Sequence, residues 1–389
     1  ITNLTITNPN GCANTYLLPV VIGATCDPCT DENNLVTNGD FEQTSNCPDN
    51  IDQFGNATAW SFYDTQNNLP DLFSACGATN LVGVPANLYG NEAAYNGTNY
   101  VGFSPISQND TTQKQYLLGQ LFPLTVGQTY CVKLQVSLAD SARFATDQIG
   151  MALYNGVFNT ATVPLNNAVF NIIDQTNGWV ELAATFVADN GYDKLAIGNF
   201  GIYDTNIDQA NAANPLNEPY YYIDGVSITP LNITVPDDVT ICAGTTATLS
   251  ATTNTCEAYW TVAGTGQLVA TDTALTVSPT QTTTYIFTGS NGTCGISDSV
   301  TVFVNQLPNI TASNVLSFCA GGAVTLDAQT NANEPTYVWT PEYNITNPKL
   351  SREHFVALDR ACRMAICWGE LVAVNLGSVR YPDLVAEIA

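Results

Sequence analysis

Carboxylates are the side chains of this sequence that could do chemistry. The chain carries 34 Asp and Glu residues but a single histidine, His354. Ser–His–Asp triads, Cys–His nucleophile systems and multi-histidine zinc sites all depend on histidine, so they are close to excluded. An enzyme with this sequence would have to work with carboxylates alone, and we predict no catalytic residue.

Three of the acids stand in two motifs that could open and close one domain. Asp40 and Glu42 lie in NGDFE, and Asp224 lies in YYYIDGVSI. The Asn-Gly-Asp turn directs the next two side chains to opposite sides, with Phe41 pointing inward and Glu42 outward. The first and last strands of a jelly roll lie side by side, so Glu42 and Asp224 could approach each other. Two carboxylates with loop carbonyls suit calcium; otherwise, the acids cap turns and face solvent.

The same two acids, Glu42 and Asp224, could also be interpreted as a glycosidase pair, which requires carboxyl groups about 5 to 10 Å apart around a sugar. We reject this interpretation, because the motifs lie at strand edges and neither a basic side chain nor a histidine accompanies them to orient a substrate.

Aromatic side chains are the other candidates for a binding site. Ring faces stack on the apolar faces of sugars while amides and carboxylates bind the hydroxyl groups. Tyr63 and Tyr203 are favoured, because they adjoin the polar loops DTQNN and DTNID. Trp60 and Tyr100 are further candidates, although the strand-like setting of Trp60 is more typical of a core residue. Tyr89, Tyr95, Tyr220 and Tyr221 complete the wider set.

Charge and hydropathy exclude several partners. The formal charge is −25 and the pI is near 4.1, with only 9 Lys and Arg among 389 residues. Backbone binding to nucleic acid needs clustered cations, so we expect no nucleic acid partner. No run of about 18 apolar residues is present, so we expect no transmembrane helix.

The elements that must position these residues are strands. Short runs rich in Val, Ile, Thr, Tyr and Phe alternate with Gly, Asn, Asp and Pro turns, for example at 130–138, 179–187 and 220–228. This pattern predicts an all-β protein, in which strands at such spacing form sandwiches or jelly rolls.

An internal repeat follows residue 230. VTICAGTTATL at Val239 is matched by VLSFCAGGAVTL at Val315, and each copy is followed by a strand-like tryptophan, Trp260 or Trp339. The two copies are 77 residues apart, measured from Cys242 to Cys319. This spacing is typical of immunoglobulin-like sandwiches, and the two tryptophans would be their buried core tryptophans. We therefore expect a closing hairpin of a preceding immunoglobulin-like domain with its linker at 1–30, a jelly roll at 31–230, an immunoglobulin-like domain at 231–306 and a truncated second copy at 307–348, all within a longer modular chain.

The last segment, 349–389, differs in composition. It holds five of the nine cations, Lys349, Arg352, Arg360, Arg363 and Arg380, together with His354. Its stretch ALDRACRMAIC, from Ala357 to Cys367, has a helix-like pattern. We interpret this tail as read-through, a frameshift or a cloning artefact; the alternative is a genuine C-terminal helix.

The twelve cysteines favour disulfides and an exported protein. Cys26 and Cys29 form a CxxC pair without the second pair that a zinc ribbon needs. We expect bridges from Cys47 to Cys76 and from Cys242 to Cys294, although the sequence alone does not prove the pairing.

Several motifs together resemble known families. NGDFE, the W-x-E-x-x-x-x-F pattern at Trp179, LAIGNF and YYYIDGVSI resemble carbohydrate-binding modules of the galactose-binding-like jelly-roll type. CPDN, LPDLFSAC, VPANLYGNEAA and YVGF resemble the jelly-roll domain of gliding-motility-associated surface proteins, in which immunoglobulin or PKD-like repeats are neighbours. The resemblance covers about residues 34 to 305. It implies a structural calcium ion held by acids at the positions of Glu42 and Asp224, with Asp40 as a weaker candidate.

The sequence therefore predicts a noncatalytic binding or adhesion protein, secreted or on the outer surface of a gram-negative bacterium, with a glycan or surface polysaccharide as its partner. Two alternatives stay open. The chain could be a structural stalk or spacer, or an accessory module of a polysaccharide-degrading enzyme whose catalytic domain lies elsewhere.

Overall fold

The computed structural model describes residues 2–7, 13–18, 33–64, 69–107, 112–146, 149–162, 165, 173–200, 207–209, 213–312, 323–331, 337–338, 349–350 and 354–358. The chain divides into two compact units. One comprises residues 1–239, 246–277 and 282–302, and the other comprises 240–245, 278–281 and 303–389. Strands dominate both units, so the predicted all-β class is confirmed.

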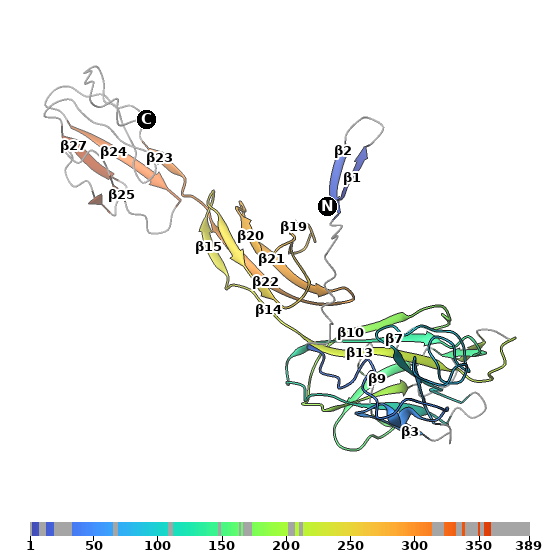
Figure 1. Cartoon of the computed structure of the whole chain (residues 1–389). Helices are drawn as coiled ribbons and strands as arrows, with labels where there is room; N and C mark the ends of the chain where they lie inside the picture. Colours follow the sequence, from blue (N-terminus) through green and yellow to red (C-terminus); the bar gives the residue numbers. More distant parts are fainter. Residues whose placement is uncertain are drawn as a thin grey trace. The chain divides into compact units, whose positions relative to one another are not determined.

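The first sandwich, residues 33–231, has two antiparallel sheets (Figure 1). Its five-stranded sheet has the order β10 (Val180–Val187), β7 (Thr129–Leu138), β13 (Tyr221–Leu231), β5 (Asn99–Phe103) and β4 (Asp71–Ser74). Its four-stranded sheet has the order β3 (Trp60–Asp64), β6 (Gln115–Gln120), β11 (Lys194–Asn199) and β9 (Ile149–Tyr154). A short pair, β8 (Phe144–Thr146) with β12 (Ile207–Gln209), and a 3-10 turn, η2 (Phe54–Asn56), complete it.

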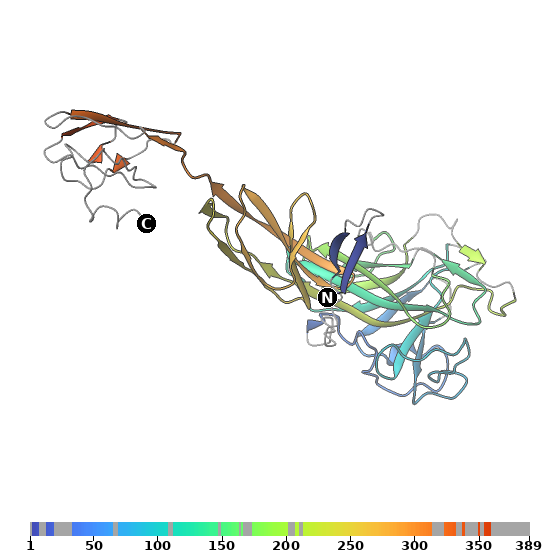
Figure 2. The ribbon, with the colours of Figure 1, turned by 90° about the horizontal axis from the view of Figure 1, so that it is seen from above.

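Alternation along the strands creates the core between these sheets. In β7, Val132, Leu134 and Val136 are at most 1% exposed and belong to one hydrophobic cluster, while Lys133 and Gln135 lie on the other face. Burial of each such aliphatic side chain contributes about 1.5–3 kcal/mol. Because β7 runs between the edge strand β10 and the central strand β13 (Figure 1), its outward residues lie one strand in from the edge of the outer face of this sheet. Figure 2 shows the same sandwich from above.

The opening motif lies against the last strand, as predicted. Leu35 N donates to Ile228 O, and Val226 N donates to Gly39 O at 2.8 Å. A Cβ on Gly39 would stand 1.9 Å from Val226 O, so only glycine allows this approach. The register of β13 against β7 shifts between Asp224 and Ser227, and this irregularity is where the two motifs meet.

A second sandwich, residues 232–305, follows. Four of its strands pair antiparallel in the order β22 (Cys294–Asn305), β21 (Thr283–Asn291), β18 (Glu257–Val262) and β19 (Leu268–Ala270). β16 (Ala247–Ser250) pairs with β20 (Ala274–Val277), β14 (Ile233–Thr234) pairs with β17 (Thr252–Thr253), and β15 is Val239–Cys242. Trp260 is fully buried with its ring 5.0 Å from that of Phe287, so it is the core tryptophan that the repeat predicts. The immunoglobulin-like assignment itself stays a prediction.

The remaining described strands are short. β1 (Thr2–Thr7) and β2 (Ala13–Leu18) form an antiparallel pair, while the predicted Asn10-Gly11 turn lies outside the described residues. In the other unit, β24 (Ala323–Thr330) pairs with β23 (Ile310–Ala312) and with β27 (His354–Leu358), and β25 (Tyr337–Val338) pairs with β26 (Lys349–Leu350). The helix-like pattern at 357–367 therefore begins in a strand, and the rest of it lies outside the described residues.

One of the two predicted disulfides is present and the other is wrong. Cys47 and Cys76 form a bridge with 5.9 Å between their Cα atoms. Cys294 instead pairs with Cys131 of the first sandwich, and Cys242 is a free, exposed thiol. The reason is position along β22: Ala243 N bonds to Asn305 O at one end of that strand, whereas Cys294 begins it about 36 Å away at about 3.3 Å per residue. A disulfide needs Cα atoms within about 7 Å.

Within the described part of the chain, no helix has the length and apolar character needed to span a membrane.

Candidate functional site

The two motif acids hold one loop of the first sandwich. We call residues 95–99 the pinned loop. Glu42 Oε1 accepts hydrogen bonds from Thr98 N and Asn99 N, both at 2.7 Å, and Glu42 Oε2 accepts from Thr98 Oγ1 at 2.9 Å. Asp224 Oδ2 accepts from Tyr95 N at 2.9 Å and Asn96 N at 3.1 Å. Each carboxylate therefore binds one end of the same loop, while the approach of Glu42 and Asp224 to each other stays a prediction.

Two glycines make room for this arrangement. Gly97 has φ +67°, and a Cβ there would lie 2.4 Å from the carboxyl group of Glu42. Gly225 has φ +57°, and a Cβ there would lie 3.0 Å from the Tyr95 ring and 3.2 Å from Gln135 Cγ. The Tyr95 ring therefore rests directly on the backbone of β13, beside Gln135.

Asp224 is completely buried. Burial raises its pKa to about 8 against the lowering effect of its backbone hydrogen bonds, and the nearby charge of Asp40 adds to the increase. Asp40 itself accepts a hydrogen bond from Glu42 N at 3.4 Å. No group of three or more His, Cys, Asp and Glu side chains within the described ranges is arranged as a metal site. Asp224 Oδ1 accepts a hydrogen bond from Gly225 N at 2.7 Å. Asp224 Oδ1 and Glu42 Oε2 thus each accept one described hydrogen bond, and such carboxylate oxygens are of the type that calcium binds.

The pinned loop presents an aromatic platform, which we define as Tyr95 and Trp179. Tyr95 is 49% exposed, and its ring centroid lies 6.5 Å from that of the half-buried Trp179 in an edge-on arrangement. Trp179 Nε1 donates to Ala93 O at 2.8 Å, which fixes the indole ring. One ring is therefore backed by the sheet and open to solvent, as a stacking surface requires.

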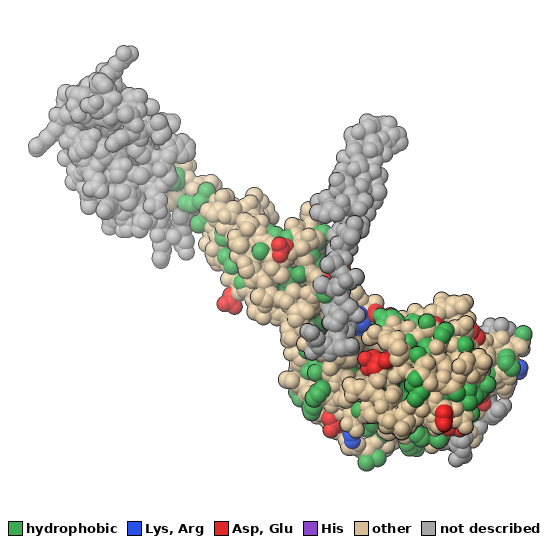
Figure 3. Space-filling model, viewed as in Figure 1, with side chains coloured by type: hydrophobic (Ala, Val, Ile, Leu, Met, Phe, Trp, Pro, Cys, Tyr) green, Lys and Arg blue, Asp and Glu red, His purple; other side chains and the backbone are tan. Residues whose placement is uncertain are grey.

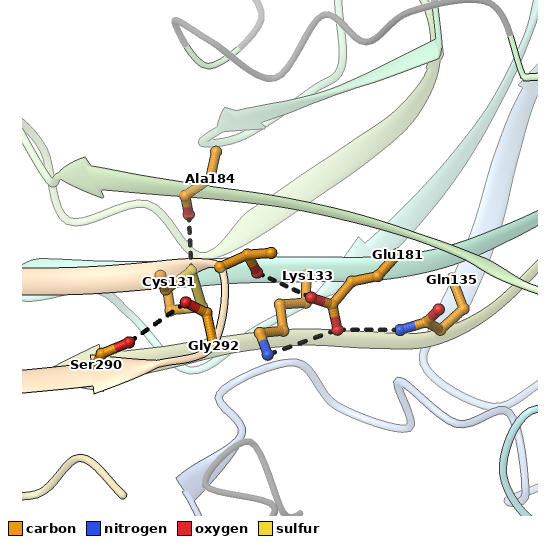
Figure 4. A network of polar contacts seen from close by, with 9 residues as sticks. Cys131, Lys133, Gln135, Glu181, Ala184, Ser290 and Gly292 are labelled. Carbon is orange, nitrogen blue, oxygen red and sulfur yellow. Dashed lines mark hydrogen bonds and ion pairs between the residues drawn. A yellow bond between two sulfur atoms is a disulfide. The ribbon is translucent and has the colours of Figure 1, made fainter. Parts of the chain in front are cut away.

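Polar side chains continue from the platform across the outer face of the five-stranded sheet. We call Lys133, Gln135 and Glu181 the polar row (Figure 4). Glu181 Oε2 accepts a hydrogen bond from Gln135 Nε2 at 3.3 Å and forms an ion pair with Lys133 Nζ at 3.5 Å. Glu181 lies opposite Gln135 in the register of β10 with β7, and Gln135 lies opposite Asp224 in the register of β7 with β13. The row thus extends from the edge strand to the bulge under Tyr95.

Charge is otherwise sparse on the surface. Figure 3 shows acidic side chains as isolated patches among uncharged ones, with few cations on the visible face. A neutral ligand rich in hydroxyl groups suits such a surface better than a ligand that needs clustered charge.

A buried acid and two tyrosines form a separate network at the other edge of the same sheet. Asp71 is 1% exposed; its Oδ1 accepts from Asp52 N at 2.6 Å, and its Oδ2 accepts from the Tyr220 hydroxyl. The Tyr89 ring stacks on that of Tyr220 with 4.1 Å between centroids. Burial raises the pKa of Asp71 to about 6, although the Tyr220 hydrogen bond acts in the opposite direction.

Two of the aromatic residues that the sequence predicts to bind sugar are buried. Trp60 is only 6% exposed, packs 4.8 Å from Phe41 and donates from Nε1 to Asn38 O. Tyr100 is fully buried, and its hydroxyl is bonded to Asn87 and to the Glu92 carbonyl. The prediction that these two rings are exposed platforms is therefore corrected: both are core residues.

Tyr63 stays a candidate. It is 37% exposed on β3, with its ring 6.2 Å from that of Tyr116 and 5.5 Å from that of Phe158. Tyr203 lies outside the described residues.

Sequence reasoning missed the platform partner and the polar row. Trp179 was not among the candidate binding residues, because a tryptophan in a strand-like setting is more typical of the core, yet it is only partly buried against the core. The signal was present in WVELAATFV, where Trp179, Glu181 and Ala183 alternate with the inward Val180, Leu182 and Ala184.

Comparison with known proteins gives weak structural similarities. No family model and no curated protein matches the chain. The K2 cleaved adhesin domain of Lys-gingipain matches with a TM-score of 0.31 and 15% identity, over 50% of this chain and 97% of that one. The CBM22-1 xylan-binding domain of Paenibacillus barcinonensis Xyn10C matches with a TM-score of 0.24 and 12% identity, over 44% and 85%. An enzymatically active tailspike domain of bacteriophage CBA120 matches with a TM-score of 0.27 and 12% identity, over 51% of this chain but 21% of that one.

Proposed function

We propose that the first sandwich is a noncatalytic carbohydrate-binding module and that sugars bind over Tyr95 and Trp179. The observation that carries this proposal is the 49% exposed Tyr95 ring, which is backed by Gly225 and held by a loop that two carboxylates fix. A ring with a fixed position and one open face can stack on a sugar without a large loss of conformational entropy.

The polar row supplies the complementary groups. Glu181 offers carboxylate acceptors on the same outer face of the sheet as the platform, and its side chain is 31% exposed. The buried Gln135 and the largely buried Lys133 hold that carboxylate in place. Sugar hydroxyl groups donate as well as accept, so such a carboxylate suits them. Both oxygens of Glu181 are already bonded within the protein, and binding without turnover is the function we propose.

The test is a binding titration of the full chain with neutral oligosaccharides that have flat, equatorially substituted rings, namely cellohexaose and xylohexaose. Tyr95→Leu should weaken binding about tenfold, because it removes the stacking surface. Tyr95→Phe should stay within about twofold of the wild type, because the ring is kept.

Tyr63→Leu is the matched comparison, since it removes the tyrosine that the sequence favoured. A tenfold loss with Tyr63→Leu and none with Tyr95→Leu would move the site to the four-stranded sheet. If the wild-type chain binds neither hexasaccharide and no glycan on a broad array, the proposal is refuted and a structural stalk is favoured.

We also propose that the protein is exported and displayed on the outer surface of a gram-negative bacterium, where it serves in adhesion. The bridges Cys47–Cys76 and Cys131–Cys294 support export, because disulfides persist in oxidising compartments. A hydrolase domain encoded in the same gene would instead favour an accessory role in polysaccharide degradation. Antibody labelling of intact cells, with and without permeabilisation, tests the location.

Calcium is a further part of the proposal. We propose that Glu42 and Asp224, with Asp40 as a weaker ligand, would hold the ion beside the pinned loop. The buried carboxyl of Asp224 next to Asp40 supports this, because a cation would offset both the desolvation of Asp224 and the repulsion between the two acids. The ion would supply only structural stabilisation of the loop.

A further inference from the structure

The second sandwich touches the first at the polar row. Its β21–β22 turn, residues 291–294, lies on the outer face of β7 and β10 (Figure 4). Cys294 is bonded to Cys131 of β7, and Thr293 Oγ1 donates to Glu181 Oε1 of β10 at 2.8 Å. Cys131, Leu231 and Cys294 together form a small buried apolar cluster. The turn is thus fixed by one disulfide bond, one charge-assisted hydrogen bond and one buried apolar contact.

The contacts continue from this turn to the aromatic platform. Thr293 binds one oxygen of Glu181, and the other oxygen binds Gln135 Nε2 at 3.3 Å. The side chain of Gln135 and the ring of Tyr95 both flank the position where Gly225 leaves room, at 3.2 and 3.0 Å from a Cβ built there. Thr293 of the second sandwich is therefore linked through Glu181 and Gln135 to the position at Gly225 on which the Tyr95 ring rests.

Glu181 is the member of this series that needs support. Its side chain is 31% exposed, so without fixed partners the carboxylate would sample several rotamers. Thr293 occupies one oxygen, while Lys133 and Gln135 share the other. Hydrogen bonds on both oxygens hold the carboxylate in one orientation, and this in turn holds the side chain of Gln135, whose Cγ flanks Gly225 together with the Tyr95 ring.

We propose that Thr293 and Cys294 of the second sandwich are positioning residues for the ligand surface of the first. This inference rests on the function proposed above and adds that the first sandwich alone carries an incomplete site. Neither residue needs to touch the sugar: Cys294 fixes the turn, and Thr293 fixes Glu181.

The test compares three variants of the full chain in the cellohexaose titration. Thr293→Val removes the hydroxyl donor and should weaken binding about five- to tenfold, a fold-change within the range for the net contribution of one ordinary hydrogen bond. Thr293→Ser keeps the hydroxyl and should restore binding to within about twofold of the wild type. Thr276→Val is the control, because its hydroxyl pairs with Thr248 on the β16–β20 pair of the same sandwich.

A second measurement needs no sugar. Hydrogen–deuterium exchange of residues 91–99 reports how firmly the pinned loop is held, since Tyr95 N and Asn96 N are bonded to Asp224. Exchange there should be faster in Thr293→Val and in the double variant Cys131→Ala, Cys294→Ala, and unchanged in Thr276→Val.

The outcomes separate the two proposals. Faster exchange in a chain that binds no sugar would keep the positioning role and refute the proposed function. Wild-type sugar affinity in Thr293→Val, or unchanged exchange in both variants, would overturn the positioning role and leave the proposed function standing.

Discussion

Replacing Asp71 by asparagine should remove a pH-dependent loss of stability from the first sandwich. Asp71 is almost fully buried, and burial raises its pKa from the ordinary 3.8 to about 6. A raised pKa means that the folded state favours the protonated acid. The contribution of protonated Asp71 to folding stability is therefore fully present below about pH 4 and is lost as the pH rises through about 6.

The magnitude follows from the shift. A change of about two pKa units corresponds to about 3 kcal/mol between full protonation and full ionisation. Of this, a loss of about 2 kcal/mol in the free energy of unfolding occurs between about pH 4.5 and about pH 7.5. Asp71→Asn keeps an oxygen acceptor for Asp52 N and cannot ionise, so this part of the pH dependence should vanish.

The assay is urea unfolding of the wild type and of Asp71→Asn at both pH values, followed by near-ultraviolet circular dichroism. The quantity of interest is the difference between the two proteins in how the free energy of unfolding changes with pH, because all other acids contribute equally to both. An identical change in both proteins would refute the reasoning, since Asp71 would then titrate near its ordinary pKa in the folded state.

Three further predictions concern the pinned loop and the disulfides. Gly97→Ala should lower stability by about 1–2 kcal/mol or more and weaken sugar binding, because the added Cβ would meet Glu42. Gly244→Ala is the control, since Gly244 also has a positive φ but has open space around it, so this variant should cost only the backbone strain. Thermal melts compare the two variants, and equal losses of stability would count against the close contact at Gly97. Calcium should raise the melting temperature over a chelator control in the wild type and not in Glu42→Gln, so equal shifts in both proteins would exclude Glu42 as a ligand. Loss of the Cys47–Cys76 bridge, which closes a 29-residue separation, should cost about 3–4 kcal/mol in urea unfolding, and an unchanged midpoint would show that the reduced chain keeps the loop in place.

The fold could be predicted from the sequence because strand alternation and turn residues are local signals. Lys133 and Gln135 face outward between buried Val132, Leu134 and Val136, which is the alternation that period-two reasoning requires. The packing of the opening segment against the last strand was also accessible, since first and last strands of such a fold lie together. What the sequence did not reveal is that both carboxylates bind the same loop.

The errors come from long-range geometry. Cys242 and Cys294 lie on an early and a late strand, but a twelve-residue strand separates its two ends too far for a bridge, and no local pattern indicates that Cys294 reaches the other sandwich. Tyr100 illustrates a second limit: the outer face of a sheet can itself be covered by loops. Tyr100 is on that face, yet Asn87 and Glu92 bury it.

We propose above all that a sugar binds on the open ring of Tyr95. A crystal structure of the full chain soaked with cellohexaose tests it most directly. We predict a pyranose ring stacked about 4 Å from the Tyr95 ring, with a hydroxyl group bonded to Glu181. A hexasaccharide bound at Tyr63, or anywhere else away from Tyr95, would contradict the claim.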